Sequence, residues 1–378
     1  MNILIGADLV PTASNFSVFK AGDGVSLVGE ELLNILNKAD YRIFNLEVPL
    51  CDNAAPIEKC GPALIASTYT ISGYNALGVD LLTLANNHIM DQDNQGLIST
   101  INLLNGNGIA YLGAGETLEQ AKKPYNFQLD GKKIGVYACA EHEFSIADDK
   151  APGANPFDPF ESLDHIAEMK GECDYAIVLY HGGKEHYRYP SPSLQKTCRK
   201  MVEKGADLVV CQHSHCVGCE EKYNGATIVY GQGNFLFDGS ENECWQTSLI
   251  VSVNENGEVS YIPLKKTGNS VRVAKEDEAA DIMDGFINRS EEIKQNGFIE
   301  RKYAEFADSM IKHYLFAFSG IKRNFVYKVF NKLLGYRLTD WILKRKYTKD
   351  KRLALQNYIE CEAHRELFIQ GLRINNKL

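Results

Sequence analysis

Seven short apolar runs constrain the fold of this chain more than any other feature, because each has the length and composition of a buried β-strand. Patterns with helical spacing lie between several of them. The runs, rich in Ile, Val, Leu and Tyr, are residues 2–7, 41–45, 79–85, 133–139, 174–180, 206–211 and 226–230. This alternation of strand and helix predicts an α/β domain.

Local signals place further elements. Residues 27–38 repeat apolar side chains at helical spacing, and Ser191 followed by Pro192 marks the start of a helix that extends to about residue 204. The segments 246–253 and 258–265 flank a turn-like Asn-Glu-Asn-Gly and predict a β-hairpin.

The chain is expected to have two parts, because strand signals stop after about residue 270. We place an α/β domain over residues 1–268 and a helical C-terminal extension over residues 269–378. Within the extension, residues 320–352 carry eleven Lys/Arg and two Asp, a local charge of 11 − 2 = +9. The whole chain carries −9, so the remainder carries −9 − 9 = −18.

The composition is that of a folded globular protein. Hydrophobic residues make up 44% and charged residues 24%, which excludes collagen-like and mainly disordered chains. The net charge of −9 excludes a whole-protein basic surface for nucleic acid. We find no apolar run of the roughly 18 residues that a membrane span needs, and no secretory signal at the first residues, so we expect a cytoplasmic protein.

The ten cysteines are expected to be reduced thiols in that compartment. Cys216 and Cys219 form a lone C-x-x-C motif. Because no second pair stands at zinc-site spacing, we interpret them as partly buried thiols rather than as metal ligands.

Side chains of the types that bind metal ions follow five of the predicted strands, at the point where each ends. Open α/β sheets bind their ligands at this carboxyl edge. Each such side chain on its own is more often a helix cap or a hydrogen-bonded neighbour, but five such events in one chain predict a shared site. The residues are Asp8, Asn45, Glu47, Asn86, Asn87, His88, His181, His213 and His215.

The donor set indicates which ions suit such a site. Mixed nitrogen and oxygen donors favour Mn, Fe or Zn over a calcium cage or a thiolate site. Two divalent ions about 3.5–4 Å apart, bridged by a carboxylate, can activate a water and stabilise the oxyanion that its attack creates. We therefore expect two divalent metal ions as cofactors.

Arranged as motifs, these residues resemble those of a known family. The motifs are Gly-Ala-Asp8, Asn45-Leu46-Glu47, Asn86-Asn87-His88-Ile-Met-Asp91 with Gly96, His181-Gly-Gly-Lys-Glu185, Gln212-His213-Ser-His215 and Gly233-Asn234-Phe235-Leu236-Phe237-Asp238. Their order is similar to that of the bacterial capsule synthesis family often called CapA-like, over about residues 1–265. That family looks like a branch of the calcineurin-like metallophosphatases. The resemblance thus implies a metallophosphatase-like two-sheet α/β/β/α sandwich, here with a C-terminal helical extension.

The resemblance implies two metals that share one carboxylate. The first would be held by Asp8, Glu47 and His215. Glu47 would bridge to the second, whose other ligands would be Asn87, His181 and His213.

The resemblance also implies roles on the substrate side. His88 would act as general acid or oxyanion stabiliser, and Asp91 would orient its imidazole. Glu185 would lie at the mouth of the cavity. The alternatives are that Asp91 caps the following helix and that Glu185 is a solvated loop residue.

One position departs from the metallophosphatase pattern, and three others depart from the CapA-like pattern. Val10 stands where metallophosphatases usually have the His of Asp-x-His, a loss that the CapA-like branch shares, so the first metal lacks a ligand. Asp93 replaces a common glycine, Ser214 replaces the proline of His-Pro-His, and Gly218 stands where glutamine is frequent. The last three leave the ligand set intact but alter the expected substrate pocket.

The leading functional hypothesis is a metal-dependent hydrolase of capsule or poly-γ-glutamate metabolism that acts on an amide or similar linkage of an anionic, peptide-like polymer. A phosphoesterase is one alternative. A non-catalytic component of a membrane-associated capsule-synthesis complex is the other.

The expected partners follow from that hypothesis and from the charge distribution. They are the anionic polymer or peptide-like substrate and no nucleic acid. The basic segment 320–352 is either an ordinary helix with solvated charges or a peripheral contact with the inner membrane face or a capsule complex.

Overall fold

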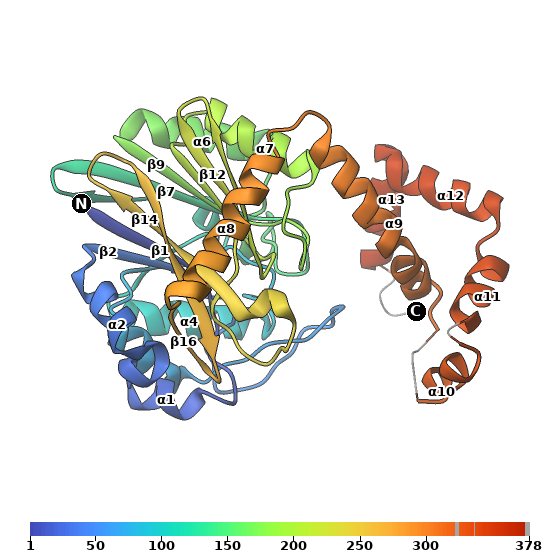
Figure 1. Cartoon of the computed structure of the whole chain (residues 1–378), viewed down its shortest axis with the longest axis horizontal. Helices are drawn as coiled ribbons and strands as arrows, with labels where there is room; N and C mark the ends of the chain where they lie inside the picture. The colour runs from blue at the N-terminus through green and yellow to red at the C-terminus, as the bar shows by residue number, and fades with distance from the viewer. Residues whose placement is uncertain (322–324, 336, 375–378) are drawn as a thin grey trace. The chain divides into compact units, whose positions relative to one another are not determined.

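The computed structural model describes residues 1–321, 325–335 and 337–374, and it divides into two compact units, Met1–Glu300 and Arg301–Leu378 (Figure 1). The predicted boundary after residue 268 falls inside the first unit, in the turn between its last two strands. Those strands and the helix that follows pack on the first unit, which therefore extends to Glu300.

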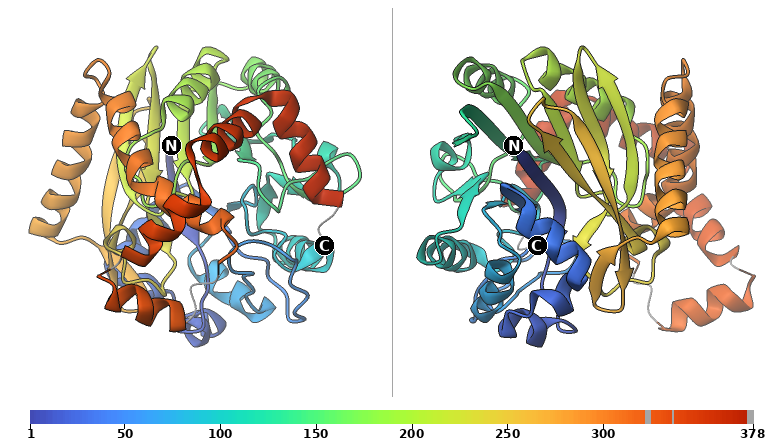
Figure 2. Two further views of the ribbon diagram at one scale, coloured as in Figure 1. Left: turned by 90° about the vertical axis from the view of Figure 1, so that its right-hand side faces the viewer. Right: turned by 60° about the vertical axis from the view of Figure 1, so that its left-hand side comes forward.

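Two β-sheets packed face to face form the centre of the first unit (Figure 2). Among the described residues, the larger sheet has the order β16-β15-β14-β1-β2-β3-β4, with β13 also paired to β1, and the smaller has the order β11-β12-β10-β9-β7-β6. The strands of the larger sheet are β1 (Asn2–Leu9), β2 (Tyr41–Asn45), β3 (Leu81–Thr83), β4 (Ala110–Leu112), β13 (Asn234–Leu236), β14 (Thr247–Asn254), β15 (Val259–Thr267) and β16 (Ser270–Val273). Those of the smaller are β6 (Tyr125–Leu129), β7 (Lys132–Ala140), β9 (Tyr175–His181), β10 (Leu208–Gln212), β11 (Val217–Tyr223) and β12 (Ala226–Gln232), and β5 (Ala114–Gly115) pairs with β8 (Gly153–Ala154).

Alternation along the central strands produces the sandwich. Ile3 and Ile5 of β1 pack between the sheets against side chains such as Val136 and Ile177 of the smaller sheet. Leu4, between them in sequence, belongs to the core on the opposite face of the larger sheet. Successive side chains of a strand point to opposite faces, so a strand buried on both faces is apolar throughout.

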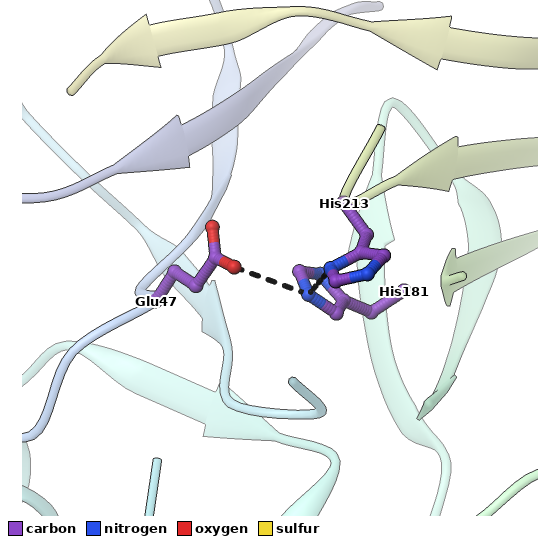
Figure 3. Close-up of side chains that lie close together, drawn as sticks. All are labelled: Glu47, His181 and His213. Carbon is purple, nitrogen blue, oxygen red and sulfur yellow. Dashed lines mark hydrogen bonds and ion pairs between the residues drawn. The ribbon is translucent and has the colours of Figure 1, made fainter. Parts of the chain in front are cut away.

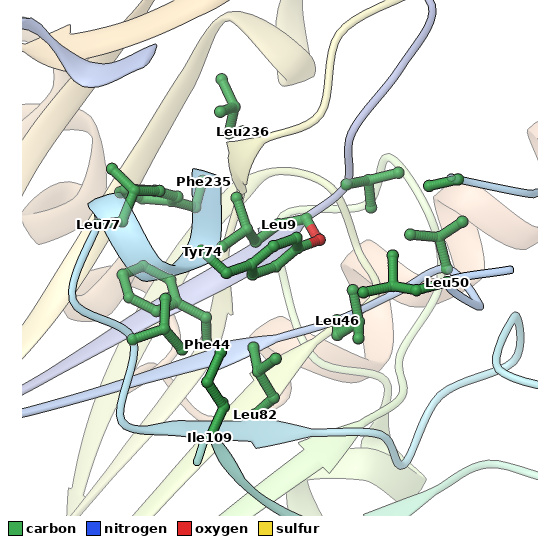
Figure 4. Packing of buried hydrophobic residues seen from close by; sticks show 14 of the residues in the cluster. Leu9, Phe44, Leu46, Leu50, Tyr74, Leu77, Leu82, Ile109, Phe235 and Leu236 are labelled. Carbon is green, nitrogen blue, oxygen red and sulfur yellow. The ribbon is translucent and has the colours of Figure 1, made fainter. Parts of the chain in front are cut away.

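Helices cover the outer faces of both sheets. Those on the larger sheet enclose a core that includes Phe44, Tyr74 and Phe235 (Figure 4). The first unit contains α1 (Phe16–Ala21), α2 (Gly24–Lys38), α3 (Ile71–Ala76), α4 (Asp93–Gly106), α5 (Leu118–Ala121), α6 (Glu161–Glu172), α7 (Pro192–Glu203), α8 (Glu276–Glu292) and the 3-10 helices Thr68–Thr70 and Glu243–Gln246. Helices α6 and α7 cover the smaller sheet, and α8 packs along β11 and β15. The layers confirm the predicted two-sheet sandwich with helices outside.

Each of the seven predicted runs contains a strand, and the predicted hairpin forms as β14 and β15. The strands that sequence reasoning missed are β4, β5, β6, β8, β11, β13 and β16. Several of these strands are only two to four residues long, which is too short for a recognisable apolar run. Strand β6 is half-exposed along its length, so it lacks the continuous apolar sequence of a buried strand.

The second unit is helical, as predicted for the extension. Its helices are the greater part of α9 (Phe298–Phe318), then α10 (Phe325–Leu333), α11 (Arg337–Lys346), α12 (Lys349–Glu360) and α13 (Glu362–Ile374). Leu315, Phe316 and Leu343 form a small buried core. None of the helices in the described ranges is long and apolar enough to cross a membrane. Of the predicted basic segment 320–352, residues 322–324 and 336 lie outside the described residues.

All ten cysteines fall within the described residues and all are free thiols. Cys216 and Cys219 are both buried, and Cys219 lies on β11. The sequence predicted only partial burial of these two thiols. Their fuller burial in the structure reflects the packing of β11 against α8.

The close approach of β11 and β12 generates a stability prediction at Gly218. A Cβ atom there would lie 1.7 Å from the carbonyl oxygen of Tyr230, which is fixed in the partner strand. We expect Gly218→Ala to lower the free energy of unfolding by about 2–3 kcal/mol, measured by urea denaturation, because the backbone must shift to accept the methyl group. Gly171→Ala, in α6 with nothing within 4 Å of its Cβ, is the control and should be neutral or stabilising. Equal stability of the two variants would contradict this account.

Candidate metal centre

The carboxyl ends of parallel strands from both sheets meet at one edge of the sandwich. In the larger sheet Asp8 of β1 is in register with Asn45 of β2. In the smaller sheet His181 ends β9 beside Gln212 at the end of β10. The residues that follow these strands therefore converge from two sheets on one region, as the strand-end pattern predicts.

The first cluster of metal-ligand types surrounds the Nε2 atom of His181 (Figure 3). This nitrogen lies 3.3 Å from Glu47 Oε1, 3.0 Å from Asn87 Oδ1 and 3.1 Å from His213 Nδ1. All four side chains are buried. One imidazole nitrogen carries at most one proton, so it cannot satisfy three such neighbours, whereas a cation among them could be bound by all four.

The second cluster comprises Asp8, Glu47 and His215, whose ligand atoms lie within 4.8 Å of one another. His215 Nδ1 is 3.3 Å from Asp8 Oδ2 and 2.8 Å from Asn234 Oδ1. Asn45 donates a hydrogen bond of 2.7 Å to the other oxygen of Asp8 and so fixes that carboxylate. Glu47 is common to both clusters, which is the position of a bridging ligand.

The Glu47 carboxylate provides the test of whether a metal fits. Among the residues that the structure describes, no group donates a hydrogen bond to either of its oxygens or to Asp8 Oδ2, and all three atoms are buried. Buried polar atoms in proteins are nearly always satisfied, because an unsatisfied one costs about 1–3 kcal/mol and a charged one more. Two cations bound between these oxygens and the histidines would satisfy them, so the residues present fit a dinuclear centre.

The two buried carboxyl groups of the clusters respond to their surroundings in opposite ways. Burial, and then repulsion by Asp8, hold the pKa of Glu47 well above its usual range. Burial also opposes the charge on Asp8, but the nearby imidazoles of His215 and His181 and the hydrogen bond from Asn45 outweigh burial and lower the pKa of Asp8. The pKa of one buried acid is thus raised while that of its neighbour is lowered, and bound cations would favour the charged form of both.

The pKa values of the three histidines are also shifted in different directions. Burial lowers the pKa of His181 to about 4, and burial with two neighbouring imidazoles holds that of His213 well below its usual range. Both are therefore neutral at pH 7, the form that binds metals. Against burial, Asp8 and Glu47 raise the pKa of His215 to about 9.

The backbone at two of the histidines is in an unfavourable conformation. His213 has φ 79° and His215 has φ 52°, in the left-handed region that favours glycine. Such residues cost about 1–3 kcal/mol each and cluster at functional sites. The loop after β10 is therefore held in a strained form that brings both imidazoles to the centre.

Beside the metal-ligand types, His88 is oriented by Asp91. His88 Nδ1 lies 2.6 Å from Asp91 Oδ2, and both side chains are largely buried. Asp91 also accepts from the backbone N–H of Leu64 at 2.6 Å, whereas α4 begins after Gln92. The side chain of Asp91 therefore contacts His88 as the resemblance implies, rather than capping the helix.

Sequence reasoning missed Lys59, which completes this arrangement. Its Nζ atom lies 2.5 Å from Asp91 Oδ1 and 3.3 Å from His88 Nδ1, and the Lys59 side chain is only 3% exposed. Lys59 comes from the irregular segment between β2 and α3, far from any motif, so the sequence carried no signal for it.

The structure places Glu185 in a half-buried loop after β9. Burial would raise the pKa of its carboxyl, but the nearby His213 and His215 outweigh burial and lower it. Glu143, which sequence reasoning also missed, contacts the first cluster directly: its Oε2 accepts from Asn87 at 3.3 Å, and its Oε1 is 3.8 Å from His213 Nε2.

An aromatic group adjoins His215 and was likewise missed. The Trp245 ring lies 4.8 Å from the His215 ring and 4.8 Å from that of Phe237. Its Nε1 donates to His186 Nε2 at 2.9 Å. Trp245 belongs to a 3-10 helix with no strand-end signal, so only the fold brings it here.

The four departures from the family pattern have structural correlates. Val10 is buried and continues β1 by donating to Leu236 O at 2.8 Å, so an apolar side chain fills that position. Asp93 has φ 55°, a conformation that favours the glycine it replaces. Ser214 is buried between the two strained histidines, and Gly218 faces the β12 backbone.

Comparison with known proteins confirms the family resemblance. A family model described as "Bacterial capsule synthesis protein PGA_cap" matches residues 9–239. The chain is 28% identical over 244 residues to "Capsule biosynthesis protein CapA" of Bacillus anthracis, covering 62% of this chain and 59% of that protein. It is 30% identical over 190 residues to "PGA biosynthesis protein CapA" of Bacillus subtilis, covering 49% of this chain and 50% of that protein. The chain thus spans between half and three-fifths of the length of these curated relatives.

Solved structures show more distant likenesses. A hypothetical protein from Thermus thermophilus gives a TM-score of 0.45 at 15% identity and covers 71% of this chain and 100% of its own. A novel phosphatase from Mycoplasma pneumoniae gives 0.44 at 12% identity, covering 71% and 94%. No statement on activity follows from likenesses this distant.

The shared position of Glu47 predicts its role in metal binding. We expect Glu47→Gln and His213→Ala each to lose most of the bound transition metal, measured by elemental analysis after dialysis against Mn²⁺ or Zn²⁺. They should also lose the metal-dependent gain in thermal stability, which amounts to about 2.7 kcal/mol at a hundredfold excess over Kd. The control is Glu221→Gln on β11, where Glu221 forms a partly buried ion pair with Arg199 of α7. Unchanged metal content in both variants would refute the dinuclear centre.

The buried contact of Lys59 with Asp91 predicts a large stability effect. We expect Lys59→Met to lower the free energy of unfolding by about 3 kcal/mol in chemical denaturation, because it leaves the Asp91 charge buried without its cation. Lys122→Met, which breaks a surface pair with Glu119, should change it by less than about 1 kcal/mol. Similar small effects in both would show that Asp91 does not need Lys59.

Proposed function

Since this chain belongs to the bacterial capsule synthesis protein family, we propose that it is a metal-dependent hydrolase that cleaves an amide or similar linkage of an anionic, peptide-like polymer. The observation that carries the proposal is the Glu47 carboxylate. Both of its oxygens are buried without a hydrogen-bond donor among the described residues, and it is shared by two clusters of metal-ligand types. A purely structural carboxylate would be expected to have donors.

The residues that would hold the two ions are those of the two clusters. Asp8 and His215 would bind one, Asn87, His181 and His213 the other, and Glu47 both. When bound, a pair of divalent ions supplies Lewis acidity and lowers the pKa of a water molecule, which suits attack on a carbonyl or a phosphoryl centre.

The remaining chemistry belongs to His88. Its Nδ1 donates to Asp91, so Nε2 is the atom that can exchange a proton with a substrate. His88 directly follows Asn87, whose Oδ1 lies 3.0 Å from His181 Nε2, and this places His88 beside the centre. We assign His88 as the general acid that protonates the leaving group, with Asp91 and Lys59 as positioning residues.

The substrate class rests on the family rather than on the geometry. Capsule biosynthesis appears in the name of the Bacillus anthracis relative, and PGA biosynthesis in that of the Bacillus subtilis relative. Because this chain matches only part of those proteins, their function is carried over here as a proposal. A γ-linked polyglutamate is a polyanion joined by amide bonds, which fits the hydrolytic chemistry of such a centre.

The role of His88 predicts a separation of rate from binding. We expect His88→Ala to lower the hydrolytic rate by about 10²–10⁴ on the true substrate while metal content stays at the wild-type level, because His88 belongs to neither of the two metal-ligand clusters. His165→Ala, beside Tyr137 and outside the centre, is the control for loss of a half-buried histidine. Wild-type turnover by His88→Ala would remove it from the mechanism.

The reaction class is tested by comparing substrates on the metal-loaded protein. We expect turnover of γ-glutamyl amides and none of phosphodiesters, with release of free amines or shortened chains as the measured product. Turnover of phosphodiesters alone would replace the proposal by a phosphoesterase. No turnover of either, with metal bound, would favour a non-catalytic role of the centre.

A further inference from the structure

Helices α10 and α11 of the second unit expose a set of large apolar side chains together with basic ones. From this combination we propose that the two helices dock on an anionic lipid bilayer, with the apolar side chains at the depth of the acyl boundary and the basic ones among the headgroups. The α10–α11 surface is defined by the apolar residues Phe330, Leu333, Leu334 and Trp341 and the basic residues Lys328, Lys332, Arg337, Lys344 and Arg345. The proposal does not depend on the metal centre.

The apolar part of this surface is large and open to solvent. Leu333 is 75% exposed, and Phe330, Leu334 and Trp341 are each more than half exposed. Together with Arg337 and Leu338, three of these four line an open hollow of about 650 Å³. Contiguous exposed apolar surface of this kind marks an interaction site rather than an ordinary solvated helix.

The charge of the same segment favours an anionic partner. Residues 325–346 carry six Lys/Arg and one Asp, a charge of 6 − 1 = +5 in a chain whose total is −9. The single acid, Asp340, is paired with Lys312 at 2.7 Å. The cations are close to the apolar side chains: Arg337 lines the hollow, and the Arg345 guanidinium stands 5.3 Å from the centre of the Trp341 ring.

The two helices are held to each other, so the surface is present before a partner binds. Asn331 of α10 accepts from the backbone N–H of Thr339 of α11 at 3.3 Å, and the Tyr327 and Thr339 hydroxyls are hydrogen-bonded. Leu343 of α11 packs in the small core with Leu315 and Phe316 of α9. A preformed surface loses less conformational entropy when it binds.

A bilayer fits this surface better than a dissolved polyanion does. A polyanion would neutralise the basic side chains but would leave Phe330, Leu333 and Trp341 in water. Anionic lipids meet both requirements, since headgroups attract Lys and Arg while Trp, Phe and Leu side chains enter the interface.

The test is sedimentation of the full-length chain with vesicles at low salt. We expect binding to phosphatidylglycerol–phosphatidylcholine vesicles, none to phosphatidylcholine alone, and strong weakening at about 0.5 M salt, where the Debye length is about 4 Å. Arg337→Gln with Arg345→Gln should weaken binding about thirtyfold, because each basic residue near an anionic bilayer strengthens it about fivefold. The charge-matched pair Lys123→Gln with Lys150→Gln, exposed on the first unit, should leave it unchanged.

A variant that changes the apolar side chains distinguishes a bilayer from other partners. Leu333→Ser with Leu334→Ser should also abolish vesicle binding, and both side chains are exposed enough for the change to leave the helices folded, checked by circular dichroism. Salt-sensitive binding to soluble poly-γ-glutamate that this double variant retains, without vesicle binding, would overturn the proposal in favour of polymer docking. Self-association that the variant abolishes, or no binding to anionic vesicles at low salt, would overturn it as well.

Discussion

The placement of two carboxylates, Asp8 and Glu47, at the meeting edge of two packed sheets is the constraint on which the rest of this site depends. Parallel strands of both sheets end in the same region, so the chain must bury acidic side chains where no described backbone group is positioned to donate to Glu47. Such an arrangement is stable only if positive charge is brought to it. The imidazoles of the smaller sheet approach from the other side, and ions would complete the neutralisation.

Several surrounding features become understandable from that constraint. His213 and His215 both have a left-handed backbone, and their ligand atoms lie within 4.8 Å of the Glu47 carboxylate. Asn86 donates to Asn45, and Asn45 donates to Asp8, so a chain of amides fixes the Asp8 carboxylate. The strained backbone at His213 and His215 lowers the stability of the fold locally. The core of the sandwich compensates for this strain, because the central strands are apolar on both faces.

The sequence predicted those parts of the molecule that depend on local pattern. Buried strands are continuous apolar runs, and ligand types at their ends follow from chain direction, so Asp8, Glu47 and the three histidines could be placed together from the order of residues alone. Lys59, Glu143 and Trp245 could not, because each lies in an irregular or short segment whose path is determined by tertiary packing. The division between units was placed too early for a related reason: β16 and α8 have ordinary local patterns, and only their packing assigns them to the first unit.

The position of Lys59 has a consequence for how this protein could be inactivated. The segment from residue 46 to residue 67 contains no helix or strand in the described structure, yet it supplies the cation that accompanies Asp91 and thereby His88. In the proposed mechanism, proton transfer by His88 thus depends on the ordering of a loop, whereas the residues that would bind the ions lie at the strand ends. Under that proposal, local opening of the loop, by proteolytic nicking or by a partner that binds it, would leave the metal-ligand clusters in place without a positioned His88. Evolution could therefore convert an enzyme of this architecture into a binding protein by changes confined to one loop.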